Sequence, residues 1–332
     1  MLTIGLLATL FLVLAAEFVN GWTDAPNAIV TVVSTRVMTL RAAVLMAMVL
    51  NALGAMAGTA VAATIGKGIV DSHAITLPAI SAAMVTIITW GAFAGKVGMP
   101  VSKSHALLAG IAGAAVAGGG FEALMWSGWT KVFTGMFLAL VIGFLGAHFL
   151  ARGIMVCAGN ASPTKAKRTF DYLQICSACS MAFNHGLNDG QKFIGIFALV
   201  LMLGGVTHEF HISFSTILIC SGVMGLGTAL GGWRIIKTVG QKMTNLASWQ
   251  GFVAESVASC TIFGASWFGI PLSTTHTIMS AIVGAASSHR ARDVRWGVMG
   301  KIALAWICTF PICGVLAYSA ALLANQLAAH SL

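Results

Sequence analysis

The sequence predicts an all-α polytopic membrane protein, and its composition and its apolar runs predict this fold class. Of 332 residues, 58% are hydrophobic and 8% are charged, whereas a soluble domain carries about 25% charged residues. Apolar runs of about twenty residues recur along the chain, and each can cross a hydrocarbon core about 30 Å thick. A soluble helical protein would need polar helix faces, which these runs lack.

The positive charge of the chain follows the ends of the apolar runs. The formal net charge is +9, and its basic residues gather at 36–41, 152–168, 234–242 and 290–301. Basic residues in short loops mark the cytoplasmic side of a membrane protein, so we expect no nucleic-acid partner. The run 2–16 lacks a basic start and a small-residue cleavage site, which favours a retained first span over a signal peptide. The seven scattered cysteines predict no disulfide framework.

The expected membrane segments follow one another in two similar series. The first series is an interrupted segment 2–35 and spans near 42–65, 74–95, 101–118 and 131–157. The second series is 171–206, 213–232, 246–268, 272–287 and 297–324. Together they predict about ten to twelve membrane segments, with 74–118 and 246–287 either full crossings or re-entrant hairpins. Segments 2–35 and 171–206 are too long for one straight pass, so we expect both to be broken near mid-membrane, where unwound backbone must line a cavity.

An internal repeat relates the two series. "VGMPVSKSHALLAGIAGAA" (97–115) aligns without gaps to "FGIPLSTTHTIMSAIVGAA" (268–286), and "NGWTDAPNAIV" (20–30) lies against "HGLNDGQKFIG" (185–195). Each half has an odd number of crossings, so the second half is expected to be inverted, as in many secondary transporters. We expect a first repeat with a connecting helix at 1–157, a basic cytoplasmic linker at 158–170 and a second repeat with a final helix at 171–332.

Acidic residues inside apolar segments form the first candidate site. Four of the nine acidic residues lie there: Glu17, Asp24, Asp189 and Glu255. A charge at the centre of a membrane helix costs about 2.5–3.5 kcal/mol on insertion scales, so Asp24 and Asp189 need a cation, a proton or a basic partner such as Lys192. Asn27 and Asn188 accompany the two aspartates, and amide and carboxylate oxygens suit a hard cation.

Hydroxyl residues after a proline form the second candidate site. "PVSKSH" and "PLSTTH" place hydroxyls where a helix is expected to begin, with the proline able to occupy its first turn. Free backbone N–H groups and the helix dipole would converge there on an oxyanion. The hydroxyl residues are Ser102, Ser104, Ser273, Thr274 and Thr275. Ordinary helix capping would explain either motif alone, but duplication favours an anion site. His105 and His276 could be ligands or packing residues.

With both motifs present, the chain resembles the inorganic phosphate transporter (PiT) family. That family carries a duplicated G-A-N-D-x-x-N and a duplicated P-x-S-T-T-H, seen here as "GWTDAPNA", "GLNDGQKF", "PVSKSH" and "PLSTTH". The resemblance covers nearly the whole chain. It implies import of inorganic phosphate across the inner membrane by symport with sodium or a proton through alternating access, with no enzymatic activity and no cofactor. It also implies a multi-pass protein that contacts lipid and forms a homodimer. A cytosolic regulatory protein is a further expected partner.

The resemblance also implies roles for particular residues. The cation-site residues are Asp24, Asn27, Asn188 and Asp189, with Asp24 and Asp189 as metal ligands if sodium is the coupling ion. The phosphate-site residues are Ser102, Ser104, Ser273, Thr274 and Thr275, to which we add Gln191 and Lys192. The candidates for gating or coupling are Glu255, His105, His276 and Lys103.

Three departures from the family motif bear on coupling. Thr23 stands where the first copy would have Asn, Lys103 replaces a hydroxyl residue, and Lys192 replaces the second copy's Asn. A tethered ammonium beside Asp189 could substitute electrostatically for one sodium ion. We therefore expect fewer coupled sodium ions than in a fully sodium-coupled relative, or protons instead.

Three other functions are alternatives to phosphate symport. A sulfate permease would not use carboxylate acceptors, because sulfate cannot donate hydrogen bonds at neutral pH. An intramembrane aspartyl protease could use Asp24 and Asp189, but it gives the hydroxyl motifs no role. A passive channel would be expected to show a repeated charged ring, which the sequence lacks.

Overall fold

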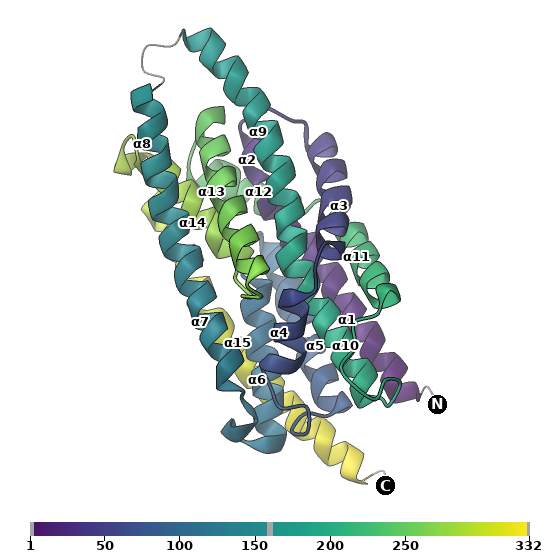
Figure 1. Ribbon diagram of the computed structural model, residues 1–332. Helices are drawn as coiled ribbons and strands as arrows, with labels where there is room; N and C mark the ends of the chain where they lie inside the picture. The colour runs from purple at the N-terminus through teal and green to yellow at the C-terminus, as the bar shows by residue number, and fades with distance from the viewer. Residues whose placement is uncertain (1–2, 158–161, 331–332) are drawn as a thin grey trace.

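The computed structural model describes residues 3–157 and 162–330, and in these residues every regular element is helical (Figure 1). Several helices begin after a Ser or Thr whose hydroxyl accepts a hydrogen bond from the N–H three residues on, which satisfies an otherwise unpaired donor. These residues are Thr3, Thr39, Thr76 and Ser213. The described residues contain two isolated β-bridges and no sheet. The prediction of an all-α chain is therefore confirmed.

The first half ends with α8. Its helices are α1 (Ile4–Thr23), η1 (Ala25–Ala28), α2 (Val30–Ser34), α3 (Leu40–Met56), α4 (Ala60–Gly68), α5 (Leu77–Val97), α6 (Lys103–Gly119), η2 (Phe121–Ala123), α7 (Trp126–Val141), η3 (Ile142–Gly146) and α8 (Ala147–Cys157). The last three form one long helix.

The second half repeats this order. Its helices are α9 (Pro163–His185), η4 (Gly186–Gly190), α10 (Gln191–Leu203), α11 (Phe214–Thr228), α12 (Trp233–Lys237), η5 (Thr238–Met243), α13 (Ser248–Trp267), α14 (Thr274–Ser287), η6 (Ala291–Asp293) and α15 (Trp296–His330). Each half thus has a long helix, a bent pair, two helices joined by a short turn, a 3₁₀ turn and a final long helix.

Small structural details recur at equivalent places in the two halves. The bridges join Val70 to Leu124 and Thr244 to Val294, each time just before the final long helix. Gly98 lies between α5 and α6, and Gly269 lies between α13 and α14. Both have a positive φ, 71° and 64°. Glycine adopts this backbone conformation without a steric penalty. These details agree with a repeat, and the inverted repeat itself stays a prediction.

The helices of the two halves interlock. α6 of the first half packs along α15, the last helix of the second half. In the same way, α14 of the second half packs along α7, η3 and α8, the last long helix of the first half. Gly113 and Gly284 permit these contacts, because a Cβ at either would lie 2.1 or 2.2 Å from a backbone oxygen of the facing helix. In Figure 1 α7–α8 runs upward and α15 runs downward.

Two expectations about helix breaks need correction. The segment 171–206 was expected to be broken, but residues 163–203 form one continuous helix, because the widened π-helical turn η4 inserts the polar motif without unwinding it. The span predicted at 42–65 is instead two helices, α3 and α4, bent by 67°. In the second half α11 and the segment after it are bent by 57° at the equivalent place.

Two smaller expectations are also revised. α9 begins at Pro163, so part of the expected linker 158–170 is helical, while 158–161 lies outside the described residues. Pro100 and Pro271 precede the N-caps of α6 and α14 by two residues and do not occupy a first helical turn.

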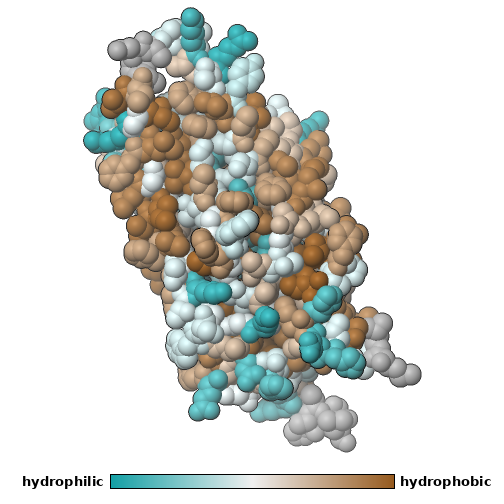
Figure 2. All heavy atoms as spheres, viewed as in Figure 1, coloured by the Kyte–Doolittle hydropathy of each residue, from teal (hydrophilic) through white to brown (hydrophobic). Residues whose placement is uncertain are grey.

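The surface is that of a chain with a hydrophobic belt. Figure 2 shows hydrophilic residues gathered mainly at the two ends of the long axis, with hydrophobic residues over much of the surface between them. Among the described residues, five helices are long and apolar enough to cross a membrane, or seven if each bent pair counts as one span. The expected total of ten to twelve segments stays a prediction.

The turns between the helices of the two hairpins meet inside the molecule. Ser102 lies before α6 and Ser273 before α14, and their hydroxyl oxygens are 2.8 Å apart. Both side chains are buried. Of the two arrangements considered for 74–118 and 246–287, this meeting of buried tips favours hairpins.

Candidate functional site

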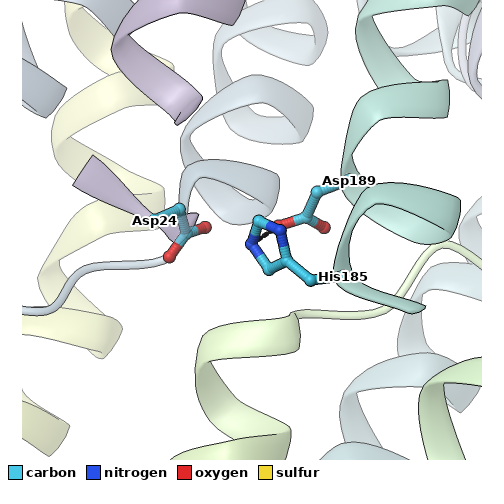
Figure 3. Close-up of side chains that lie close together, drawn as sticks. All are labelled: Asp24, His185 and Asp189. Atoms are coloured by element: carbon cyan, nitrogen blue, oxygen red, sulfur yellow. Dashed lines mark ion pairs between the residues drawn. The ribbon is translucent and has the colours of Figure 1, made fainter. Parts of the chain in front are cut away.

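The two acidic motifs meet where α1 ends and where α9 continues into α10. Asp24 is the C-cap of α1, and Asp189 lies in η4. One ligand atom each from Asp24, His185 and Asp189 lie within 4.8 Å of one another, and all three residues are buried. Figure 3 shows the imidazole of His185 between the two carboxylates. The structure therefore brings together two aspartates that the sequence repeat pairs across 165 residues.

Asp24 is placed by the interruption of the first helix. Pro26 has no backbone N–H, so it cannot donate the next helical hydrogen bond, and the chain tightens into η1. The backbone N–H of Asp24 still donates to Asn20 O at 2.8 Å. The Asn27 Nδ2 donates to Asp24 Oδ1 at 2.7 Å. The break thus turns one carboxylate and one amide into the interior.

Asp189 is placed by a π-helical turn. Such turns are rare and often lie at functional sites. His185 Nε2 is 3.3 Å from Asp189 Oδ2, and Lys192 Nζ donates to Asp189 Oδ1. His185 Nδ1 lies 2.8 Å from Asn51 Oδ1 of α3, which fixes the ring with Nε2 facing the carboxylate. An outer partner of this kind typically orients a histidine at an ion site.

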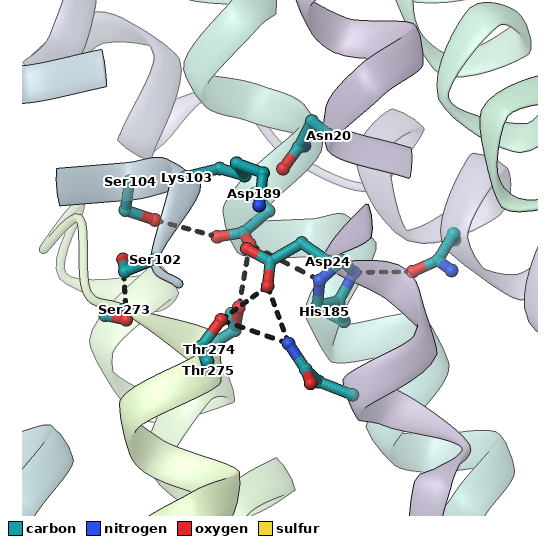
Figure 4. Close-up of polar contacts among 12 residues, drawn as sticks. Asn20, Asp24, Ser102, Lys103, Ser104, His185, Asp189, Ser273, Thr274 and Thr275 are labelled. Atoms are coloured by element: carbon teal, nitrogen blue, oxygen red, sulfur yellow. Dashed lines mark hydrogen bonds and ion pairs between the residues drawn. The ribbon is translucent and has the colours of Figure 1, made fainter. Parts of the chain in front are cut away.

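The hydroxyl motifs reach both aspartates from the other side. Thr275 Oγ1 donates to Asp24 Oδ1, and Thr274 Oγ1 donates to Asp189 Oδ2 at 2.7 Å. Ser104 Oγ lies 3.4 Å from Asp189 Oδ1. Figure 4 shows these hydroxyls and the two carboxylates around one point. The first turns of α6 and α14 therefore carry donors at the same place as the acidic motifs.

Ser102 and Ser273 act as helix caps and contact each other. The hydroxyl of each accepts a hydrogen bond, at 3.2 Å, from the backbone N–H of the histidine three residues on. Ser273 Oγ also lies 2.6 Å from His276 Nδ1. The rings of His105 and His276 have centroids 4.4 Å apart, and His276 also contacts Trp306 at 3.8 Å. Both histidines are thus packed behind the hydroxyls, next to aromatic side chains.

Several oxygens around the aspartates lack a hydrogen-bond partner among the described residues. These atoms are Glu17 Oε1, Asn20 Oδ1, Asp24 Oδ2, Asn27 Oδ1 and Asn188 Oδ1. All five side chains are at most 1% exposed. A buried acceptor without a donor is costly, and carboxylate and amide oxygens are the ligands of hard cations. These five acceptor oxygens could therefore serve as ligands of a cation.

Buried charges of both signs lie around this point. Asp24 and Asp189 are each 1% exposed, and so are Lys103 and Lys192. Lys103 Nζ lies 3.4 Å from the Val101 carbonyl oxygen. Two ammonium groups therefore accompany two carboxylates, which lowers the electrostatic cost of holding an anion here.

Two predicted site residues have other contacts. Asn188 Nδ2 donates to Ser266 Oγ at 2.8 Å. The Gln191 Oε1 accepts from the backbone N–H groups of Val61 at 2.9 Å and Ala62 at 3.4 Å, and thereby caps the start of α4.

Glu255 has a separate hydrogen-bond cluster. Its carboxylate accepts hydrogen bonds from Thr31 of α2 and Ser177 of α9. The side chain is fully buried. None of the hydrogen bonds described above joins these three residues to Asp24 or Asp189.

His185 and Asn51 were not assigned a role from the sequence. The signal for His185 was its position four residues before Asp189 on one helix, where side chains share a face. Asn51 lies on another helix, 134 residues away, so no local pattern could have indicated it.

The comparisons with known proteins agree on one family. Residues 20–317 match the model of the phosphate transporter family. A protein of Rhizobium meliloti named "Probable low-affinity inorganic phosphate transporter" is 40% identical over 312 residues, covering 93% of this chain and 92% of the relative. A Bacillus subtilis protein of the same name is 37% identical over 321 residues, with 95% of each chain covered.

A solved structure has the same fold. Its title is "The sodium-dependent phosphate transporter", and it superposes with a TM-score of 0.90 at 23% sequence identity. The match covers 98% of this chain and all of the other.

Proposed function

The chain belongs to the phosphate transporter family, and from this membership we propose that it imports inorganic phosphate by symport with a cation. The family and its named members identify a multi-pass membrane transporter and not an enzyme. The aspartyl protease weighed from the sequence is thereby excluded. Import, symport and the coupling ion are the parts that we propose.

One observation supports symport most strongly: hydroxyl donors and acidic acceptors share a single buried point. Thr274 and Thr275, adjacent in sequence, bind different aspartates, one from each half. An oxyanion needs donors and a cation needs acceptors, and here the hydroxyl donors are hydrogen-bonded to the acidic acceptors. Binding of a cation to the Asp24 carboxylate would release the Thr275 hydroxyl toward phosphate, which couples the two ligands in one site.

The substrate is proposed to be phosphate rather than sulfate because acceptors line the site. Phosphate carries hydroxyl protons at neutral pH and sulfate does not. The carboxylates of the buried Asp24 and Asp189 supply acceptor oxygens of this kind. A protonated oxyanion can donate to such atoms, whereas for sulfate they would be repulsive.

Alternating access is proposed to use the two halves. The long helices α7–α8 and α15 run in opposite directions in Figure 1, as expected for an inverted repeat. The hairpin tips that carry Ser102 and Ser273 meet at the centre. Rocking of one half against the other would open the site to one side at a time.

The coupling ion is proposed to be sodium or a proton. The oxygen-rich acceptor set suits sodium, and the structural relative carries sodium dependence in its title. Lys192, buried beside Asp189, supplies positive charge that a sodium ion would otherwise bring. We further propose a homodimer surrounded by lipid.

Reconstitution tests this function. The purified protein in proteoliposomes is expected to accumulate labelled phosphate when an inward sodium or proton gradient is imposed, and excess arsenate but not sulfate is expected to compete. Uptake that only equilibrates phosphate under every gradient would instead identify a passive channel.

A further inference from the structure

The two halves place different residues at one equivalent position beside their aspartates. Asn27 follows Asp24 by three residues, and Lys192 follows Asp189 by three. Thr275 and Ser104 are also equivalent in the second motif of the repeat, 171 residues apart. The two halves can therefore be compared atom by atom within this one chain.

In the second half an ammonium group lies beside the aspartate. Lys192 Nζ contacts Asp189 Oδ1, Ser104 Oγ at 2.5 Å and Leu272 O at 2.7 Å. An ammonium has three donors, and here three oxygens of different types surround it. A carboxylate, a hydroxyl and a backbone carbonyl are also the ligand types that hold a hard cation.

In the first half a neutral amide takes the equivalent place. Asn27 Nδ2 donates to Asp24 Oδ1 at 2.7 Å and to Thr275 Oγ1 at 3.1 Å, which copies two of the three contacts of Lys192. It brings no charge, however. Asp24 Oδ2 and Asn27 Oδ1 are left without a donor in the described residues, so this half keeps the acceptors that a mobile cation would use.

We propose that the Lys192 ammonium is a tethered cation that permanently fills the second-half ion site, so that a mobile coupling cation uses only the Asp24–Asn27 site. This inference rests on the proposed symport function and deepens it. Lys192 then determines how many cations accompany each phosphate.

Lys103 is the matched comparison within the chain. It is also a buried lysine near the site, but its Nζ has a longer contact, 3.4 Å, to the Val101 carbonyl oxygen. Its equivalent in the second half is Thr274. Replacing Lys103 by Thr also removes a buried ammonium, but it does not empty the position between three oxygens that Lys192 occupies.

The experiment compares sodium dependence in Lys192→Asn, Lys103→Thr and the reciprocal variant Asn27→Lys, all in proteoliposomes at fixed pH. For the wild type we expect at most one sodium ion per phosphate, a Hill coefficient of at most about 1 for sodium. Lys192→Asn is expected to raise this coefficient by about one, and Lys103→Thr is expected to leave the sodium profile as in the wild type, whatever its rate. Asn27→Lys is expected to remove any sodium dependence.

A second readout guards against variants that fold poorly. Sodium is expected to protect Lys192→Asn, or the longer Lys192→Gln, against thermal unfolding in detergent more than it protects the wild type, because a ligand that binds the native state stabilises it. If neither variant is monodisperse, Asn27→Lys decides: a retained sodium response overturns the proposal.

The proposal and the transport function fail in different ways. No accumulation of phosphate by the wild type would contradict symport itself. Accumulation with a sodium Hill coefficient near 2 in the wild type, or a coefficient unchanged in folded Lys192→Asn, would overturn the tethered cation while leaving symport intact.

Discussion

The hydroxyl of Thr275 donates a hydrogen bond to the carboxylate of Asp24, 251 residues away in the sequence. Thr275 lies in the first turn of α14 and Asp24 at the end of α1. This contact joins the hydroxyl motif of one half to the acidic motif of the other. Neither half alone holds a complete set of donors and acceptors.

The first prediction concerns the Thr275 hydroxyl. Thr275→Val keeps the shape of the side chain but leaves Asp24 without this donor. A hydrogen bond to a charged group contributes about 1.5–3 kcal/mol, so we expect kcat/KM for phosphate uptake to fall by about tenfold or more. Thr275→Ser restores the hydroxyl and is expected to recover most of the activity. Equal uptake by the Val and Ser variants would show that the hydroxyl has no role.

The second prediction concerns the buried ion pair of Asp189 and Lys192. Asp189→Ala leaves the Lys192 ammonium buried without its carboxylate, which is expected to destabilise the protein by about 3–5 kcal/mol. The double variant Asp189→Ala/Lys192→Met removes both charges and is expected to recover much of the thermal stability but none of the uptake. Additive losses in the double variant would show that the two side chains are not coupled.

The third prediction separates helix capping from phosphate binding at Gln191. Gln191→Met removes the acceptor for the first N–H groups of α4, which is expected to cost about 1 kcal/mol of stability. Gln191→Glu keeps a carbonyl-type oxygen and is expected to retain the cap. Thermal unfolding and the KM for phosphate are measured together. A large rise in the KM of Gln191→Met for phosphate with unchanged stability would show that Gln191 binds phosphate and does not act mainly as a cap.

The fourth prediction tests the orientation of the chain in the membrane. Single cysteines at Lys67, in α4, and at Arg168, in α9, are placed in a background without the seven native cysteines. Residue 168 belongs to the basic group 152–168, which is expected on the cytoplasmic side, and residue 67 is expected on the opposite side. A membrane-impermeant thiol reagent is therefore expected to label the residue 67 variant in intact cells and the residue 168 variant only after permeabilisation. Labelling of both in intact cells would contradict the assigned orientation.

The meeting of Asp24 and Asp189 could be predicted because the chain is duplicated. The same polar motif appears twice in apolar surroundings, and a membrane charge needs a partner. The hydroxyl motif could be paired in the same way, and the structure brings Ser102 and Ser273 into contact. The apolar runs and the internal repeat therefore predicted the all-α fold and the meeting of the paired motifs.

The details that could not be predicted depend on contacts between distant helices. The interrupted polar motif at 184–192 suggested a broken helix, but a π-helical turn accommodates it, and the bends lie at 57–59 and 229–232 instead. Gln191 was grouped with its sequence neighbours, whereas its oxygen contacts Val61, 130 residues away. Asn51 behind His185 is a similar case.

An anomalous-diffraction measurement on crystals grown with arsenate, a phosphate analogue, tests the shared site most directly. We predict one arsenic peak within hydrogen-bond distance of hydroxyls from both Ser102–Ser104 and Ser273–Thr275, adjacent to Asp24 and Asp189. A peak that contacts only one hydroxyl motif, or that lies away from both aspartates, would contradict a single site built by the two halves.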